Sequence, residues 1–199
     1  MKGKEREAGS SDPMLERLLK LGDIGRRYFV VNSFDGVLTV LGIVMGTFIS
    51  NISNPYIPIT TGMGALVALG ISGFSSAYLA ERAERRKDLS ELENRMLKDL
   101  KGTYHEKRIR KLSFKISMVN GIAPFVTGLV CVFPFVLVVF DIISMDIAYG
   151  ASMGVSLAVL SFLGYFLGSV SKGRRLISAI KMLFVGIATA LILYLLGGF

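Results

Sequence analysis

The sequence has almost none of the residues that build thiolate metal sites or disulfide-bonded folds. It contains one cysteine, Cys131, one histidine, His105, and no tryptophan among 199 residues. A lone cysteine cannot form an internal disulfide, and its place in an apolar run favours a packing role. A zinc or copper site of the Cys/His type is therefore excluded, and His105 is expected on the surface. The sequence also lacks a catalytic triad, a phosphate-binding loop and a cofactor fingerprint, so neither an enzyme nor a permanently bound cofactor is expected.

Charged residues are scarce as well, at 19% of the chain, whereas 52% is hydrophobic and the mean hydropathy is +0.56. The apolar residues form long blocks and do not alternate with polar ones, which is typical of helices that cross a bilayer. The sequence therefore predicts an all-α polytopic membrane protein with five transmembrane helices. Their approximate ranges are 29–50, 57–80, 116–140, 147–170 and 176–196.

The basic residues, which give the chain a net charge of +8, lie between the apolar blocks in a one-sided pattern. Seven of the 23 Lys and Arg precede the first block, twelve lie between the second and third, and four flank the junction of the last two. With a cytoplasmic N-terminus, all of them are on the inner side, as the positive-inside rule requires. The charge is thus a topology signal, and no nucleic-acid partner is expected. We expect a multi-pass protein of the cell membrane, or of a vacuole or other organelle in a eukaryote.

Two polar segments adjoin the membrane domain, which comprises residues 29–199. Residues 1–28 are expected to form a cytoplasmic tail and a short amphipathic helix at the interface, or else a plain basic anchor. No cleaved signal peptide is expected, because the next helix is too long and a small-residue cleavage site is lacking. The second helix should continue without a breaker into the cytoplasmic segment 81–115 as far as Gly102, projecting about 30 Å.

One carboxylate, Asp35, lies inside the first apolar block. Charge at membrane depth is costly and usually marks function. Helical spacing places small and polar residues on the same face, namely Thr39, Gly42 and Gly46. A low dielectric disfavours the charged form, so Asp35 could hold a proton that a divalent metal ion displaces. In the alternative interpretation Asp35 only caps or pairs with a neighbour, for which the candidates are Arg26, Arg27 and Asn120.

The third block contains Pro124 and Pro134. Each proline lacks an N–H and frees a carbonyl one turn earlier, which inside a membrane must find a partner or line a cavity. We expect a transport path past Asp35, lined by Asn32, Gly36, Thr39, Met45, Asn120 and Pro124. The thioether of Met45 suits a borderline-soft ion such as Fe²⁺, with packing as the alternative role.

Four carboxylates follow the second block at steps of three and four residues: Glu81, Glu84, Asp88 and Glu91. This spacing places them on one helix face. Such a ladder suits divalent ions that prefer oxygen ligands, and it could collect metal at the mouth of the path. Alternatively, these residues form ordinary ion pairs with lysines and arginines one turn away on a solvated helix.

Several segments resemble the vacuolar iron transporter family in order and spacing, among them NSFDGVLTVLGIVMG, GISGFSSAYLAERAERR and KMLFVGIATALILYLLGG. The most specific part is the Asp-Gly-x-x-Thr core formed by Asp35, Gly36 and Thr39. The resemblance implies five helices, a homodimer, and export of Fe²⁺ or Mn²⁺ from the cytoplasm in exchange for protons. It also implies that Asp35 is the essential aspartate and that Glu81 and Glu84 belong to the metal-collecting mouth.

The sequence departs from the family pattern in two places. Gly73 stands where the family has a methionine that lines the ion path. Segment 81–115 is shorter than the family's glutamate-rich insertion and more basic than acidic.

The alternatives to metal export are a non-transporting membrane assembly or scaffold protein and a proton-coupled transporter of another solute.

Overall fold

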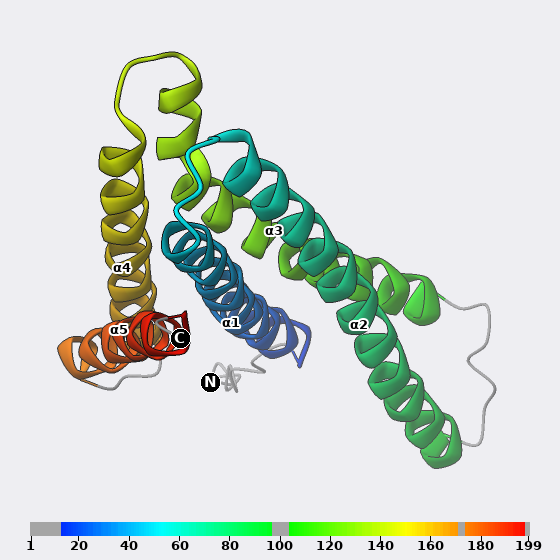
Figure 1. Ribbon diagram of the computed structural model, residues 1–199. Helices are drawn as coiled ribbons and strands as arrows, with labels where there is room; N and C mark the ends of the chain where they lie inside the picture. Colours follow the sequence, from blue (N-terminus) through cyan, green and yellow to red (C-terminus); the bar gives the residue numbers. More distant parts are fainter. Residues whose placement is uncertain (1–12, 97–103, 171–173, 198–199) are drawn as a thin grey trace.

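The computed structural model describes residues 13–96, 104–170 and 174–197, which form five helices and their connecting turns (Figure 1). The helices are α1 (Pro13–Ile49), α2 (Tyr56–Met96), α3 (Tyr104–Val139), α4 (Met145–Val170) and α5 (Arg175–Gly197). No strand occurs within the described ranges. Each helix contains a stretch long and apolar enough to cross a membrane. The predicted all-α membrane fold with five spanning helices is therefore confirmed.

The first helix is longer than the sequence pattern indicated. α1 begins at Pro13 and continues without a break through residues 14–28, where a separate interfacial helix was expected. The physical reason is that no proline follows Pro13 within α1, and isolated glycines weaken a helix without ending it. α2 is continuous over 41 residues, and its membrane-compatible stretch ends at Glu84.

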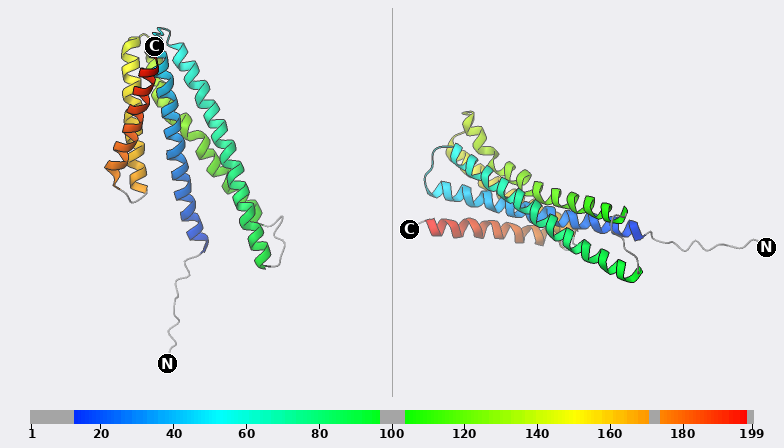
Figure 2. Two further views of the ribbon diagram at one scale, coloured as in Figure 1. Left: turned by 60° about the horizontal axis from the view of Figure 1, so that its bottom comes forward. Right: turned by 90° about the vertical axis from the view of Figure 1, so that its right-hand side faces the viewer.

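α1 occupies the centre of the bundle and is the one described helix that contacts the other four. α2 packs mainly against α3, and α4 packs mainly against α5. In Figure 2, α1 runs between the α4–α5 pair on one side and α2 on the other. The orientation of α1 about its own axis therefore decides which of its residues are enclosed.

The core lies where α1, α3 and α4 meet. The rings of Phe135 and Tyr149 are both buried there, with centroids 5.2 Å apart in an edge-to-face arrangement. Gly186 is the buried residue of α5, whose apolar side chains mostly face outward. Exposed apolar side chains also cover much of α2 and α3, which is the surface expected of a protein surrounded by lipid.

Two tight turns close one end of the bundle. α1 and α3 are each followed by a residue in the left-handed region, Asn51 (φ 53°) and Asp141 (φ 55°). Asn and Asp tolerate this conformation better than other non-glycine residues, so they can end a helix. The hydroxyl of Tyr149 donates a hydrogen bond of 2.8 Å to the carbonyl of Ile52, which ties the first turn to α4. This end is called the turn end below.

At the opposite end, α1, α2 and α3 extend beyond α4 and α5 (Figure 2). The start of α1, the end of α2 and the start of α3 lie here, and so do most of the basic residues that the structure describes. This end is called the basic end.

Candidate functional site

Asp35 lies on the face of α1 that is turned away from the core. The next residue, Gly36, is buried, whereas Asp35 is exposed on the single chain. Steps of three and four residues continue this face along the helix, and we call the resulting set the Asp35 face: Tyr28, Asn32, Asp35, Thr39, Gly42 and Gly46. The polar face inferred from the sequence is thus present, but it points outward.

Two polar side chains of the Asp35 face bond to their own helix. The hydroxyl of Thr39 donates to the backbone carbonyl of Asp35 at 2.8 Å, and the amide of Asn32 donates to the carbonyl of Tyr28 at 3.2 Å. In both bonds the side chain is the hydrogen-bond donor and a backbone carbonyl is the acceptor. The hydroxyl oxygen of Thr39 and the amide oxygen of Asn32 therefore keep lone pairs with which they can bind a cation beside Asp35.

The other side of α1 is held tightly against α3. Gly36 packs on the backbone of Pro124 with no room for a side chain between the helices. Around this contact, the hydroxyl of Ser33 donates to the carbonyl of Ala123, and the hydroxyl of Thr127 donates to the carbonyls of Ala123 and Ser33. These hydroxyls supply donors near the backbone that Pro124 interrupts.

Asn120 lies one turn before Pro124, at the contact between α3 and α2. It is 4% exposed, and its amide donates a hydrogen bond of 2.6 Å to the carbonyl of Gly73. Its side-chain oxygen is buried and accepts no hydrogen bond in the structure. A Cβ on Gly73 would lie 3.3 Å from the backbone oxygen of Asn120. Gly73 thus packs against Asn120 and has no side chain that could act as a ligand.

Met45 lies away from Asp35. Its side chain is buried in the bundle. Residues 35 and 45 are ten positions apart, which corresponds to about 15 Å along the helix axis. The structure therefore does not bring this thioether to the carboxylate.

The acidic end of α2 lies close to the start of the Asp35 face. Glu81 is only 4% exposed, and Glu84, one turn further on, is exposed. The phenol of Tyr28 on α1 is within electrostatic reach of both carboxylates. Tyr28 and Asp35 share a face and lie about 10 Å apart along the axis, so the charge of Glu81 and Glu84 reaches the start of the Asp35 face.

The remaining members of the carboxylate ladder, Asp88 and Glu91, belong to α2, but their side chains lie outside the described part of the structure. Among the side chains that are described, no three of His, Cys, Asp and Glu gather closely enough to hold a metal ion. Asp35, Glu81 and Glu84 therefore do not form a single cluster.

Tyr28 and Ser33 were not identified from the sequence. Tyr28 continues the spacing of the Asp35 face by one further step of four residues, so the helical period could have revealed it. Ser33 acts by donating a hydrogen bond to a carbonyl of α3. A local sequence pattern does not encode which carbonyl lies opposite Ser33.

Comparison with known proteins identifies relatives of this chain. A sequence model of the VIT family matches residues 94–198, from the end of α2 to the end of α5. An uncharacterized protein of Methanocaldococcus jannaschii is 31% identical over 179 residues, which cover 88% of this chain and 90% of the relative. No solved structure matches the chain.

Proposed function

The chain belongs to the VIT family, whose members are membrane transporters of metal ions, and we propose that it exports Fe²⁺ or Mn²⁺ from the cytoplasm in exchange for protons. The metal, the direction and the proton coupling are those implied by the resemblance to the vacuolar iron transporter family. The observation that carries the proposal is the position of Asp35 on an accessible face of a membrane helix. Tyr28, at the start of this face, is within electrostatic reach of the two carboxylates of α2.

In this proposal Asp35 is the group shared by the proton and the metal. A carboxylate must lose its proton to bind a metal ion, so metal binding from one side releases a proton and protonation from the other side releases the metal. The hydroxyl oxygen of Thr39 and the amide oxygen of Asn32 flank Asp35 and supply further hard ligands. Hard oxygen ligands of this kind suit Mn²⁺ and Fe²⁺ better than the soft ion Cu⁺, which prefers sulfur.

Glu81 and Glu84 form the cytoplasmic mouth, with Asp88 and Glu91 further along α2. Negative charge at a pore mouth raises the local concentration of cations and speeds their capture. This assignment requires the basic end to face the cytoplasm. The distribution of Lys and Arg supports that orientation through the positive-inside rule.

The exposure of Asp35 supports a homodimer. A carboxylate facing lipid at membrane depth is unfavourable, so the Asp35 face needs a cover. On this face a Cβ added to Gly46 would meet no atom within 4 Å, and glycines allow the close approach of a second helix. A second copy related by a two-fold axis would place two Asp35 faces together and add the ligands that one chain lacks.

The experiment that tests this function is metal and proton flux in anaerobic proteoliposomes. Wild-type protein should move Fe²⁺ or Mn²⁺ with an opposite flux of protons, and Asp35→Asn should reduce both to the level of protein-free liposomes. Asp141→Asn is the matched control, because it also removes one carboxylate, and asparagine tolerates the left-handed conformation found there. Undiminished flux in Asp35→Asn would overturn the mechanism.

Thermal unfolding separates this function from a scaffold protein, and flux separates it from a transporter of another solute. A metal that binds only the folded state stabilises it by about 2.7 kcal/mol at a concentration of 100 times Kd. A scaffold protein would show no shift with Fe²⁺ or Mn²⁺. A transporter of another solute would show proton flux that the metal does not drive.

A further inference from the structure

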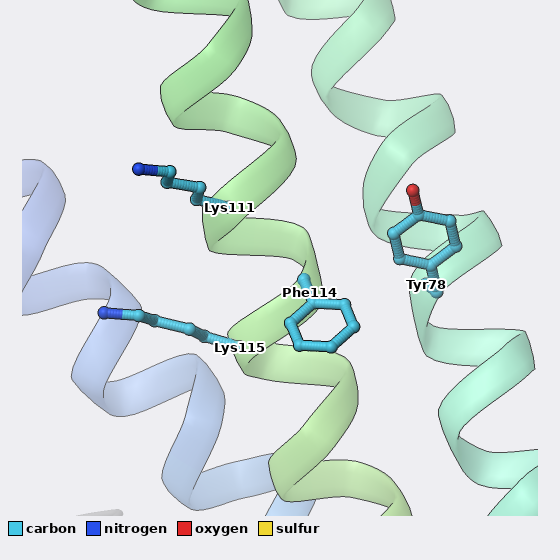
Figure 3. Close-up of a pocket in the computed structure, with 4 residues that line it drawn as sticks. All are labelled: Tyr78, Lys111, Phe114 and Lys115. Atoms are coloured by element: carbon cyan, nitrogen blue, oxygen red, sulfur yellow. The ribbon is translucent and has the colours of Figure 1, made fainter.

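A shallow groove runs between α2 and α3 at the basic end, lined by Tyr78, Lys111, Phe114 and Lys115. Lys111 and Lys115 are one turn apart on α3, and their side chains extend in the same direction (Figure 3). Tyr78 comes from α2, and Phe114 lies on the part of α3 that faces it (Figure 3). The groove therefore has an aromatic floor formed by Tyr78 and Phe114. Two neighbouring cations lie at its α3 edge, with side chains that extend away from Tyr78 (Figure 3).

Aromatic contacts hold this floor together. Phe74 and Tyr78 on α2 stack with ring centroids 6.2 Å apart, and Phe74 meets Phe114 of α3 edge-to-face at 5.7 Å. The guanidinium of Arg82 lies over the ring of Tyr78, 6.0 Å from its centroid. A third cation thus approaches the groove from α2.

The groove lies at the boundary of the membrane-compatible stretches, which end at Glu84 in α2 and begin at Ser113 in α3. Lys111 and Lys115 are exposed at this level, and neither is paired with a carboxylate in the part of the chain that the structure describes. Two unpaired ammonium groups at a membrane boundary are suited to an anionic headgroup.

Lys111 and Lys115 begin a strip of residues along one side of α3 that changes from basic to apolar along its length. Continuing from Lys111 and Lys115 by steps of three and four residues, it passes Met118 and Ile122, which are 44% and 50% exposed. This order, with charge at the boundary and apolar surface toward the middle of the bilayer, matches the order of headgroup and acyl chain in a phospholipid.

We propose that this strip is a binding site for an anionic phospholipid of the leaflet at the basic end. The phosphate lies between the ammonium groups of Lys111 and Lys115, the ring of Phe114 borders the glycerol region, and an acyl chain follows Met118 and Ile122. The bound lipid supports the junction of α2 and α3. The site is separate from the Asp35 face and does not depend on transport.

The test is thermal unfolding of the purified protein in detergent supplemented with phosphatidylglycerol or phosphatidylcholine. Unfolding is followed by a thiol-reactive dye, because Cys131 is the sole cysteine and is buried in the folded state. Phosphatidylglycerol should raise the Tm of the wild type above that in phosphatidylcholine, and Lys111→Gln/Lys115→Gln should lose most of this shift. Native mass spectrometry should show roughly 25-fold weaker binding of phosphatidylglycerol by the double variant, about fivefold for each cation.

Arg86→Gln/Lys87→Gln is the matched control, because it removes two exposed cations of α2 beyond the groove and makes the same change in charge. It should keep the phosphatidylglycerol shift. Equal losses in the two double variants, or a retained shift in Lys111→Gln/Lys115→Gln, would overturn the site. Equal stabilisation by inorganic phosphate would show that the site takes a free anion and overturn the lipid assignment. If the double variant cannot be purified, Lys115→Gln against Lys87→Gln decides the question in the same assay.

Discussion

Gly36 of α1 meets Pro124 of α3 so closely that a Cβ at residue 36 would lie 2.6 Å from the carbonyl oxygen of Pro124. This contact fixes the rotation of α1 about its axis. Successive residues of a helix are about 100° apart, so enclosing Gly36 turns Asp35 toward the outside. The proline that interrupts α3 thus helps to decide where the membrane carboxylate points.

The first prediction concerns this contact. Gly36→Ala should lower stability by about 1–3 kcal/mol, because a methyl group has to displace backbone atoms of Pro124 and not a flexible side chain. The measurement is the Tm of the purified protein. Gly64→Ala is the control, since no atom lies within 4 Å of its Cβ position and alanine favours a helix. Equal Tm values for the two variants would contradict the close packing.

The second prediction concerns the bond between Asn120 and Gly73. Asn120→Ala removes a hydrogen bond of 2.6 Å between α3 and α2, and should cost about 0.5–1.5 kcal/mol. Asn32→Ala should cost less, because the bond from Asn32 stays within α1. Thermal unfolding of both variants checks the order. A larger loss for Asn32→Ala would mean that Asn120 does not join the helices.

The third prediction concerns the homodimer. In a Cys131→Ala background, Gly46→Cys should form a disulfide between two copies under mild oxidation. Phe162→Cys, at an exposed position of α4, should not do so. Non-reducing electrophoresis of membranes measures the product. Crosslinking of the Phe162 variant without crosslinking of the Gly46 variant would place the interface elsewhere.

The fourth prediction concerns the mouth of the path. Glu84→Lys/Asp88→Lys should raise the metal concentration needed for half-maximal flux, because it replaces attraction of cations by repulsion. The maximal flux should change less, since Asp35 is intact. Asp146→Lys reverses a carboxylate at the turn end without altering the left-handed position of Asp141, and serves as the control. An unchanged half-maximal concentration would return these residues to the role of ion pairs on a solvated helix.

Local patterns predicted the helices well and their faces only in part. The apolar blocks located five spanning helices, and the absence of a breaker after Glu81 predicted the continuous α2. Residues 14–28 also lack a helix breaker. Amphipathic spacing suggested a separate helix there, whereas in the structure these residues belong to α1. Met45 shows a further limit, because the sequence did not reveal that its thioether lies buried in the bundle, about 15 Å along the axis from Asp35.

By itself, the sequence determined the number of helices, the placement of Asp35 within a membrane helix, and the polar residues that share its face. These properties depend on hydrophobic length and helical period, which are local. The tertiary structure alone decided that Asp35 faces outward, that Gly73 packs against Asn120, and that Tyr28 lies within electrostatic reach of two carboxylates of α2. Such relationships depend on how helices distant in sequence cross and rotate against each other, and this follows from close packing at a few small residues such as Gly36.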